Sequence, residues 1–158
     1  MSPTREPSPL QSALEAFERD RAEHVTAGPA DADEVRRTED RLGVRLPEAF
    51  REFLERVGGG LFYQGHEIFG SHRVMIHDIE LVPDLVSFGR SVRRSGGPAA
   101  PEGVVPFHRE GSRVHVLDLQ GTEPDSAPIR ALDGSRTYPN LAAFLETLVP
   151  SGDPSARA

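Results

Sequence analysis

The sequence predicts an α+β fold, with N-terminal helices, a mostly antiparallel sheet and one closing C-terminal helix. Up to residue 57 the apolar residues recur three or four positions apart, which is the spacing of an amphipathic helix. Between residues 61 and 132 they fall instead into short runs separated by glycine and proline, as in antiparallel strands. A last helical pattern follows Pro139. Helices and strands that are segregated along the chain favour the α+β class.

The length of the chain fits one domain, because 158 residues can bury a single hydrophobic core. We expect this domain to span residues 8–150. Residues 1–7 are small, polar and rich in proline, so we expect a disordered N-terminus there. Residues 151–158 have the same character and are expected to form a flexible tail.

The first helix is expected over residues 8–25. Ser8 is a typical N-cap, Pro9 suits the first helical position, and Gln11 stands where the partner of a capping box belongs. The segment 26–29 contains Gly and Pro and should end the helix. Its buried stripe would consist of Leu10, Ala13, Leu14, Phe17 and Val25.

Two more helices are expected on either side of a short extended link. The second begins at Asp31 or Asp33, since acidic residues stabilise the positive end of a helix, and ends at Gly43. The third opens at Pro47 and stops at Gly58–Gly60, because glycine adopts the left-handed conformation at little cost. The inward-facing positions of the two helices would be Val35, Thr38, Leu42, Phe50, Phe53, Leu54 and Val57.

The rest of the chain reads as short strands, with a brief helix at 83–92, a surface loop at 95–103 and a closing helix from Pro139. The segments around Glu110–Gly111 form an expected hairpin, and Asp133–Gly134 forms an expected turn. The predicted strands cover residues 61–63, 66–69, 73–77, 104–108, 113–119 and 128–132. The closing helix would bury Leu141, Phe144, Leu145 and Leu148.

Composition and charge exclude several classes of protein. The net charge of −7 disfavours direct nucleic-acid binding, which relies on basic patches that neutralise phosphates. All 18 basic residues are arginine and there is no cysteine, which removes lysine Schiff-base, disulfide and thiolate chemistry. No apolar run approaches the roughly 20 residues that span a bilayer. We therefore expect a cytoplasmic protein that binds neither nucleic acid nor membrane.

The histidines give little support to a metal site or a catalytic site. His66, His72 and His77 lie in one stretch, but their spacings cross a predicted turn and differ from the tight pairs of zinc sites. His115 and Asp118 lie three apart on one predicted strand, so their side chains should point to opposite faces. The Gly-x-Ser-x-Gly motif of hydrolases is missing. We expect no metal, no cofactor and no catalysis, although a small hydrolase that uses His and Asp stays as an alternative.

The segment between Asp33 and Gly70 resembles the SUKH superfamily, whose best-known branch is the Smi/Knr family of cell-wall assembly regulators. The family pattern is an acidic helix that ends in Leu-Gly-x-x-Leu-Pro, followed by an aromatic residue, Phe-Leu and a glycine-rich stop. In this chain the pattern is formed by Leu42, Gly43, Leu46, Pro47, Phe50, Phe53, Leu54, Gly58, Gly59 and Gly60. Weaker later matches are Ile68–Gly70, Val105–Phe107, Val116–Leu119, Pro128–Ile129 and Asn140–Leu148. The resemblance covers residues 31–149 and implies a SUKH-like α+β fold.

The resemblance also implies a function. Many bacterial SUKH proteins are immunity proteins that bind and neutralise toxins, often nucleases or nucleic-acid deaminases encoded beside them. Other branches are regulatory interaction modules. The chain is therefore expected to bind a protein partner, namely a toxin domain encoded nearby, with a regulatory scaffold that has no toxin partner as the alternative.

The sequence offers two acidic patches as candidates for partner binding, and either could equally be solvated surface. The loop patch consists of Asp118, Glu123, Asp125 and Asp133. The helix patch consists of Glu48, Glu52 and Glu55. Phe62, Tyr63 and Tyr138 are candidate aromatic anchors that could instead belong to the core.

Overall fold

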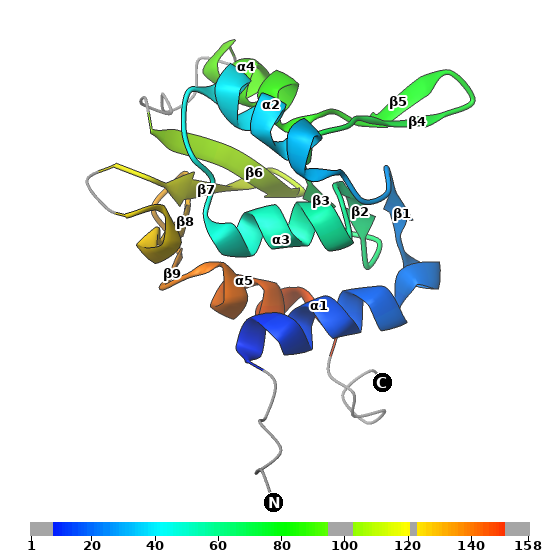
Figure 1. Cartoon of the computed structure of the whole chain (residues 1–158), viewed down its shortest axis with the longest axis horizontal. Coiled ribbons are helices and arrows are strands. Elements are labelled where there is room, and N and C mark those ends of the chain that lie inside the picture. Colours follow the sequence, from blue (N-terminus) through cyan, green and yellow to red (C-terminus); the bar gives the residue numbers. More distant parts are fainter. Residues whose placement is uncertain (1–7, 95–102, 121–122, 151–158) are drawn as a thin grey trace, which may run out of the picture.

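A computed structural model describes residues 8–94, 103–120 and 123–150 of the chain (Figure 1). The expected N-terminal disorder at 1–7, the expected tail at 151–158 and most of the expected loop at 95–103 lie outside the described residues. In the described part, helices at the start and the end of the chain enclose a mostly antiparallel sheet. The predicted α+β class is confirmed.

Among the described residues, the main sheet has seven strands in the order β1-β2-β3-β6-β7-β8-β9, and all neighbouring strands are antiparallel. These strands are β1 (Val25–Thr26), β2 (Gly60–Phe62), β3 (His66–Ile68), β6 (Val104–Glu110), β7 (Arg113–Asp118), β8 (Ile129–Ala131) and β9 (Thr137–Tyr138). A separate hairpin consists of β4 (Val74–Ile76) and β5 (Ile79–Val82), which pair only with each other. In Figure 1 this hairpin projects from the rest of the molecule.

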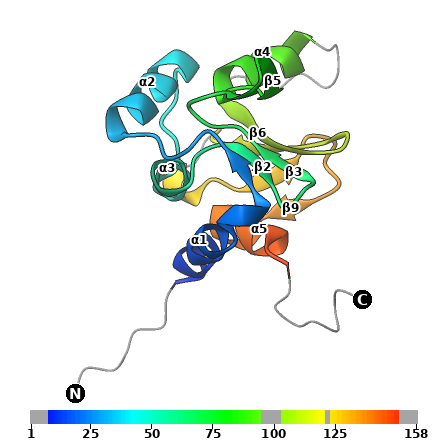
Figure 2. The ribbon, with the colours of Figure 1, turned by 90° about the vertical axis from the view of Figure 1, so that its right-hand side faces the viewer.

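The helices form layers around a central helix. These helices are α1 (Pro9–Arg19), α2 (Ala32–Leu42), α3 (Glu48–Arg56), α4 (Leu85–Arg94) and α5 (Leu141–Leu148), with short 3-10 turns at Arg21–Glu23 and Pro124–Ser126. The central α3 lies between α2 on one side and the packed pair of α1 and α5 on the other, as both views show (Figures 1 and 2). Every helix among the described residues is too short or too polar to cross a bilayer.

Capping residues place the starts of the first helices as the sequence predicts. Asp31 caps α2 in a complete capping box, because its side chain accepts from the backbone N–H of Glu34 while the Glu34 side chain accepts from the backbone N–H of Asp31. Gly43 ends α2 with a φ of 74°. Ser8 caps α1 by accepting from the backbone N–H of Gln11 at 3.2 Å. The Gln11 side chain, however, reaches across to α3 instead of completing a capping box.

The structure corrects several expected boundaries. The first helix ends at Arg19 instead of continuing to Val25. Val25 lies in β1 because its backbone pairs with Leu61 of β2, a long-range contact that outweighs the local helical pattern. Two strands that the sequence did not predict, β5 and β9, each complete a hairpin with the strand before them. The last helix starts after Asn140, whose side chain accepts from the backbone N–H of Ala143, rather than at Pro139.

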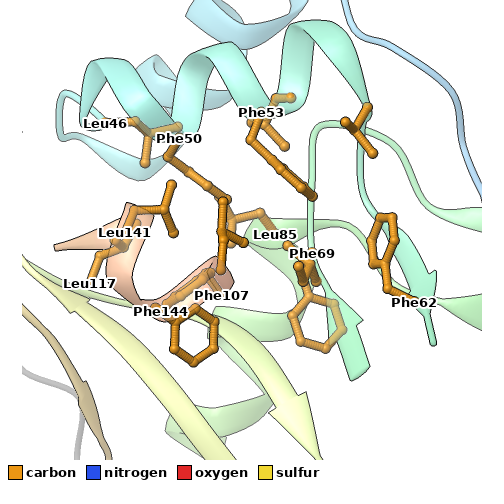
Figure 3. Packing of buried hydrophobic residues seen from close by; sticks show 14 of the residues in the cluster. Leu46, Phe50, Phe53, Phe62, Phe69, Leu85, Phe107, Leu117, Leu141 and Phe144 are labelled. Atoms are coloured by element: carbon orange, nitrogen blue, oxygen red, sulfur yellow. The ribbon is translucent and has the colours of Figure 1, made fainter. Parts of the chain in front are cut away.

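The core lies between α3 and the sheet (Figure 3). Phe50 and Phe53 of α3 are fully buried, and the Phe50 ring meets Phe107 of β6 edge-on at 5.5 Å between ring centroids. Phe107 in turn contacts Phe144 of α5 at 5.4 Å. The apolar residues of the Leu-Gly-x-x-Leu-Pro block thus hold α3 against the sheet, which explains why this pattern defines the fold.

Candidate functional site

The loop acids are mostly engaged within the chain. Asp118 accepts from Arg130 Nε at 3.2 Å and from the backbone N–H of Gln120 at 3.1 Å. Asp133 accepts from the backbone N–H of Ser135, and hydrogen bonds from Ser135 lower the pKa of the Asp133 carboxyl. Both carboxylates therefore hold turns and strands in place, and their role in partner binding stays a prediction.

The structure brings one acid of each predicted patch together. Asp125 accepts from the backbone N–H of Glu48 at 2.6 Å, so its carboxylate satisfies a free donor at the start of α3. Glu123 and the Glu48 side chain are exposed beside this contact.

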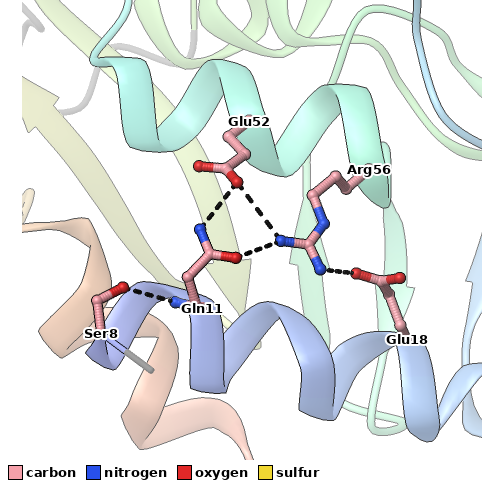
Figure 4. Close-up of polar contacts among 5 residues, drawn as sticks. All are labelled: Ser8, Gln11, Glu18, Glu52 and Arg56. Carbon is pink, nitrogen blue, oxygen red and sulfur yellow. Dashed lines mark hydrogen bonds and ion pairs between the residues drawn. The ribbon is translucent and has the colours of Figure 1, made fainter. Parts of the chain in front are cut away.

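Glu52 serves to hold α1 against α3 (Figure 4). Its carboxylate accepts from Gln11 Nε2 at 2.9 Å and pairs with Arg56 at 3.4 Å. Arg56 also donates to Gln11 Oε1 at 2.7 Å and forms an ion pair with Glu18. Both contacts are made by Oε1 of Glu52, and they favour a structural role for this residue.

Glu55, the last residue of the helix patch, is exposed and lines a cleft of about 640 Å³ between α2 and α3. The cleft carries charges of both signs. Its charged residues are Arg36, Glu39, Asp40, Arg45, Arg51 and Glu55. Because three guanidinium groups face three carboxylates, the cleft has no net charge that would select an anion or a cation.

His66, His72 and His77, which are close in sequence, have different partners in the structure. His72 pairs with Glu34 of α2, and His77 lies in the turn between β4 and β5. His66 instead contacts His108, with 3.1 Å between Nδ1 and Nε2, and His108 contacts His115, with 3.0 Å between their Nδ1 atoms. No group of three or more His, Cys, Asp or Glu residues in the described part of the chain is placed to hold a metal ion.

This chain of three imidazoles is uncharged at neutral pH. Burial lowers the pKa of His108 to about 2 and that of His115 to about 4, with the neighbouring cations and imidazoles adding to the effect. At one end, His66 Nε2 lies 3.3 Å from a Glu110 carboxylate oxygen; at the other, His115 Nε2 is buried without a hydrogen-bond partner among the described residues. A cavity of about 180 Å³ adjoins both ends. The arrangement links β3, β6 and β7 through neutral hydrogen bonds.

The exposed apolar surface lies elsewhere, on the β4–β5 hairpin. Val74 and Val82 at its base are buried, whereas Ile79 near its tip is 69% exposed. The large hydrophobic side chains of the hairpin that face solvent are Met75, Ile76, Ile79 and Leu81. Val25 is the one other exposed large hydrophobic residue in the described part of the chain. We call the exposed side chains of Met75, Ile76, Ile79 and Leu81 the hairpin surface.

Sequence reasoning missed both of these features, although it contained a signal for each. His108 and His115 flank the expected turn at Glu110–Gly111, on strands that were predicted to pair, so a register argument would have placed them side by side. The alternation in Ile79–Val82 is a strand pattern, but it follows His77–Asp78, which is not the Asn-Gly or Asp-Gly pair that marks a hairpin turn. Of the candidate aromatic anchors, Phe62 lies in the core.

Comparisons with known proteins identify the family. The sequence model of the SMI1/KNR4 family (SUKH-1) matches residues 29–147. Among solved structures, a crystal structure of a protein from Pseudomonas syringae pv. tomato has the same fold, with a TM-score of 0.62 at 17% identity over 85% of this chain and 96% of that one. The search of curated protein sequences found no match. Because the family model covers well over half of the sequence, the chain belongs to the SMI1/KNR4 family of the SUKH superfamily.

Proposed function

We propose that this protein is a non-enzymatic binding module, specifically an immunity protein that neutralises a toxin of the nuclease or nucleic-acid deaminase type by binding it. Membership of the SMI1/KNR4 family over residues 29–147 is the observation that carries the proposal. Members of this family act in general through protein–protein contacts and not through catalysis. The partner is expected to be encoded beside this gene.

The charge of the chain supports this class of partner. Enzymes that act on nucleic acids present basic surfaces to the phosphate backbone. A chain with 25 acidic and 18 basic residues attracts such a surface at long range and raises the rate of association. The exposed carboxylates at the junction of Glu48 and Glu123 contribute to this field.

The structure also suits binding better than hydrolysis. A general base must reach the proton of a nucleophile, with about 3 Å between the heavy atoms. The histidines of the His66–His108–His115 chain bond to one another and to Glu110, and the one ring nitrogen without a partner among the described residues, His115 Nε2, is buried. Thr147, a hydroxyl residue beside the same cavity, donates to the Phe144 carbonyl at 2.6 Å. These contacts give the imidazole chain a role in joining strands.

The test uses the product of the adjacent upstream gene. That gene is expressed in a host cell with and without this protein, and the two purified proteins are then mixed in a calorimeter. We expect growth arrest that this protein relieves and a stable complex with a dissociation constant in the nanomolar range, which is common for interfaces of standard size. An isolated gene, or a neighbour whose product neither arrests growth nor binds, would favour the regulatory scaffold.

A further inference from the structure

The hairpin surface concentrates almost all the large apolar side chains that the described residues expose. Four of the five lie within the nine residues of Val74–Val82. Scattered apolar side chains are ordinary on a protein surface, but a contiguous group marks a contact site. The hairpin is therefore the part of the described surface where large apolar side chains are exposed as a group.

The pairing register places four apolar side chains of the hairpin on one face. Val74 pairs with Val82 and Ile76 pairs with Ile79, with a β-bulge between the two pairs, and residues opposite each other share a face of the sheet. Val74 and Ile76 are two positions apart and lie on this face, whereas Met75 and Glu80 pair on the other face. The first pair is buried against the core and the second is exposed. One face of the hairpin is therefore apolar from its base to its tip, and its outer half lacks a covering element within the described residues.

The base of the hairpin is fixed to the body of the protein. Just before β4, Ser71 accepts a hydrogen bond from Thr38 Oγ1 at 2.9 Å, and His72 pairs with Glu34 of α2. At the tip, His77 and Asp78 form a tight turn with φ values of 48° and 65°. A hairpin with a fixed base and a tight turn at its tip loses little conformational entropy on binding, which favours affinity.

The charges along the hairpin indicate what it contacts. Arg73 and Glu80 face each other across the strands at 3.9 Å and offset each other. Asp78, in the turn, forms no ion pair with another described residue, so the tip carries one net negative charge. A charge at that point is unfavourable in the hydrocarbon of a membrane. It also disfavours a second copy of this chain, because the protein as a whole carries a charge of −7.

We infer that the β4–β5 hairpin is the element that enters the protein partner, and that the partner offers an apolar recess bordered by a basic residue. The apolar face of Ile76 and Ile79 fills the recess, and Asp78 pairs with the basic group at its rim. This inference rests on the proposed function and names the surface that performs it.

The experiment measures binding of the purified adjacent-gene product to the full-length chain and to matched variants. The double variant Ile76→Ser with Ile79→Ser removes the apolar face, and Val25→Ser is its control because Val25 is also exposed but lies on β1. Asp78→Asn removes the tip charge while keeping a residue that tolerates positive φ. Glu146→Gln, an exposed acid on α5, removes the same charge elsewhere.

The hairpin variants and their controls should separate clearly. We expect the double serine variant to weaken binding by at least about tenfold, as for residues at the centre of an interface, and Val25→Ser to bind as the wild type does. Asp78→Asn should weaken binding about threefold at low salt and less at high salt, while Glu146→Gln has no effect. Hydrogen exchange of the complex should show Val74–Val82 protected relative to the free chain.

Each contrary outcome has its own meaning. If the wild type binds and the double serine variant binds equally well, the hairpin is not the contact, although the proposed function stands. If the wild type does not bind, the proposed function fails and the inference falls with it. Two further results would overturn the choice of partner: a wild-type dimer that the serine variant converts to monomer on gel filtration, or Ile79-dependent sedimentation with phosphatidylglycerol vesicles.

Discussion

The turns of two hairpins in this protein begin with the same two φ values, but the two hairpins differ in their surroundings. The turn after β2 places Tyr63 and Gln64 at φ values of 48° and 65°, and the turn after β4 places His77 and Asp78 at the same two values. The β2–β3 hairpin is joined by β1 on one edge and by β6 on the other. The β4–β5 hairpin has no further strand on either edge within the described residues.

The difference shows that the turn sets the shape of a hairpin but not its role. Phe62 of β2 and Ile68 of β3 are buried, so the first hairpin contributes to the stability of the whole domain. An isolated two-stranded hairpin is only marginally stable in water, and the second one depends on its buried base. Its exposed tip adds little to stability and remains available for binding.

The largest expected effect is a difference in stability between two truncations, one in each hairpin. Phe62→Ala should lower the free energy of unfolding by about 3–5 kcal/mol, because the Phe62 ring packs against Phe17 and Phe53 and its removal leaves a cavity. Ile79→Ala should change it by less than about 0.5 kcal/mol, since Ile79 is exposed. Chemical denaturation of both variants measures the contrast. Equal losses would mean that the second hairpin is also part of the core.

The histidines allow a second contrast, through pH. Burial gives His108 and His115 folded-state pKa values of about 2 and about 4, whereas unfolded histidine titrates near 6.5. Below about pH 6.5 the unfolded chain therefore binds more protons than the folded chain. Above about pH 6.5 these histidines leave the free energy of unfolding unchanged. As the pH falls through the range between the unfolded-state and folded-state pKa values, the free energy of unfolding decreases.

We expect the free energy of unfolding to fall by about 3 kcal/mol between pH 7 and pH 4.5 through His108 alone, at about 1.4 kcal/mol for each pH unit below 6.5. His108→Gln keeps a hydrogen-bonding side chain that does not titrate in this range and should remove most of that contribution. The control is His77→Gln in the exposed turn, which should leave the pH dependence as in the wild type. Denaturation curves at the two pH values measure this difference. If the free energy of unfolding of His108→Gln fell with pH as steeply as that of the wild type, His108 would not be the source of the pH dependence.

Local signals explain which elements could be predicted from the sequence. The caps at Ser8 and Asp31 and the stop at Gly43 act within a few residues, so they can be read without knowing the fold. β1 could not be predicted, because its two residues become a strand only by pairing with β2, some 35 positions later. α1 packs on the domain through buried Leu14 and Phe17 and through the contacts of Arg56 with Gln11 and Glu18, and these partners are also distant in sequence.

The candidate site was harder to predict than the fold for the same reason. An acidic residue looks the same in sequence whether it caps a helix, as Asp125 does, or holds two helices together, as Glu52 does. Likewise, nothing within residues 73–77 indicates that Met75 and Ile76 stay exposed. They are exposed because the outer part of the hairpin projects beyond the core that buries Val74 and Val82, which is a property of the assembled fold (Figure 1).

A smaller effect is expected from glycines of the first hairpin. A Cβ at Gly60 would collide with the Val25 carbonyl oxygen of the paired β1 strand, so Gly60→Ala should destabilise the protein by about 1–3 kcal/mol. Gly65, in the same hairpin, has open space around its Cα, and Gly65→Ala is the matched control with an effect near zero. Thermal unfolding of both variants tests this. A tolerated Gly60→Ala would mean that β1 can move away from β2 without loss.

The smallest expected effect concerns the turn of the second hairpin. His77 and Asp78 occupy left-handed positions that Asn and Gly adopt more readily, so the double variant His77→Asn with Asp78→Gly should stabilise the hairpin by about 0.5 kcal/mol. Because the hairpin pairs only with itself, this gain should appear as roughly twofold slower hydrogen exchange within Val74–Val82 and not in the global unfolding transition. If the global transition shifted by the same amount, the hairpin would unfold together with the domain. It would then be a structural member of the sheet layer, as β2–β3 is, and not an independent contact element.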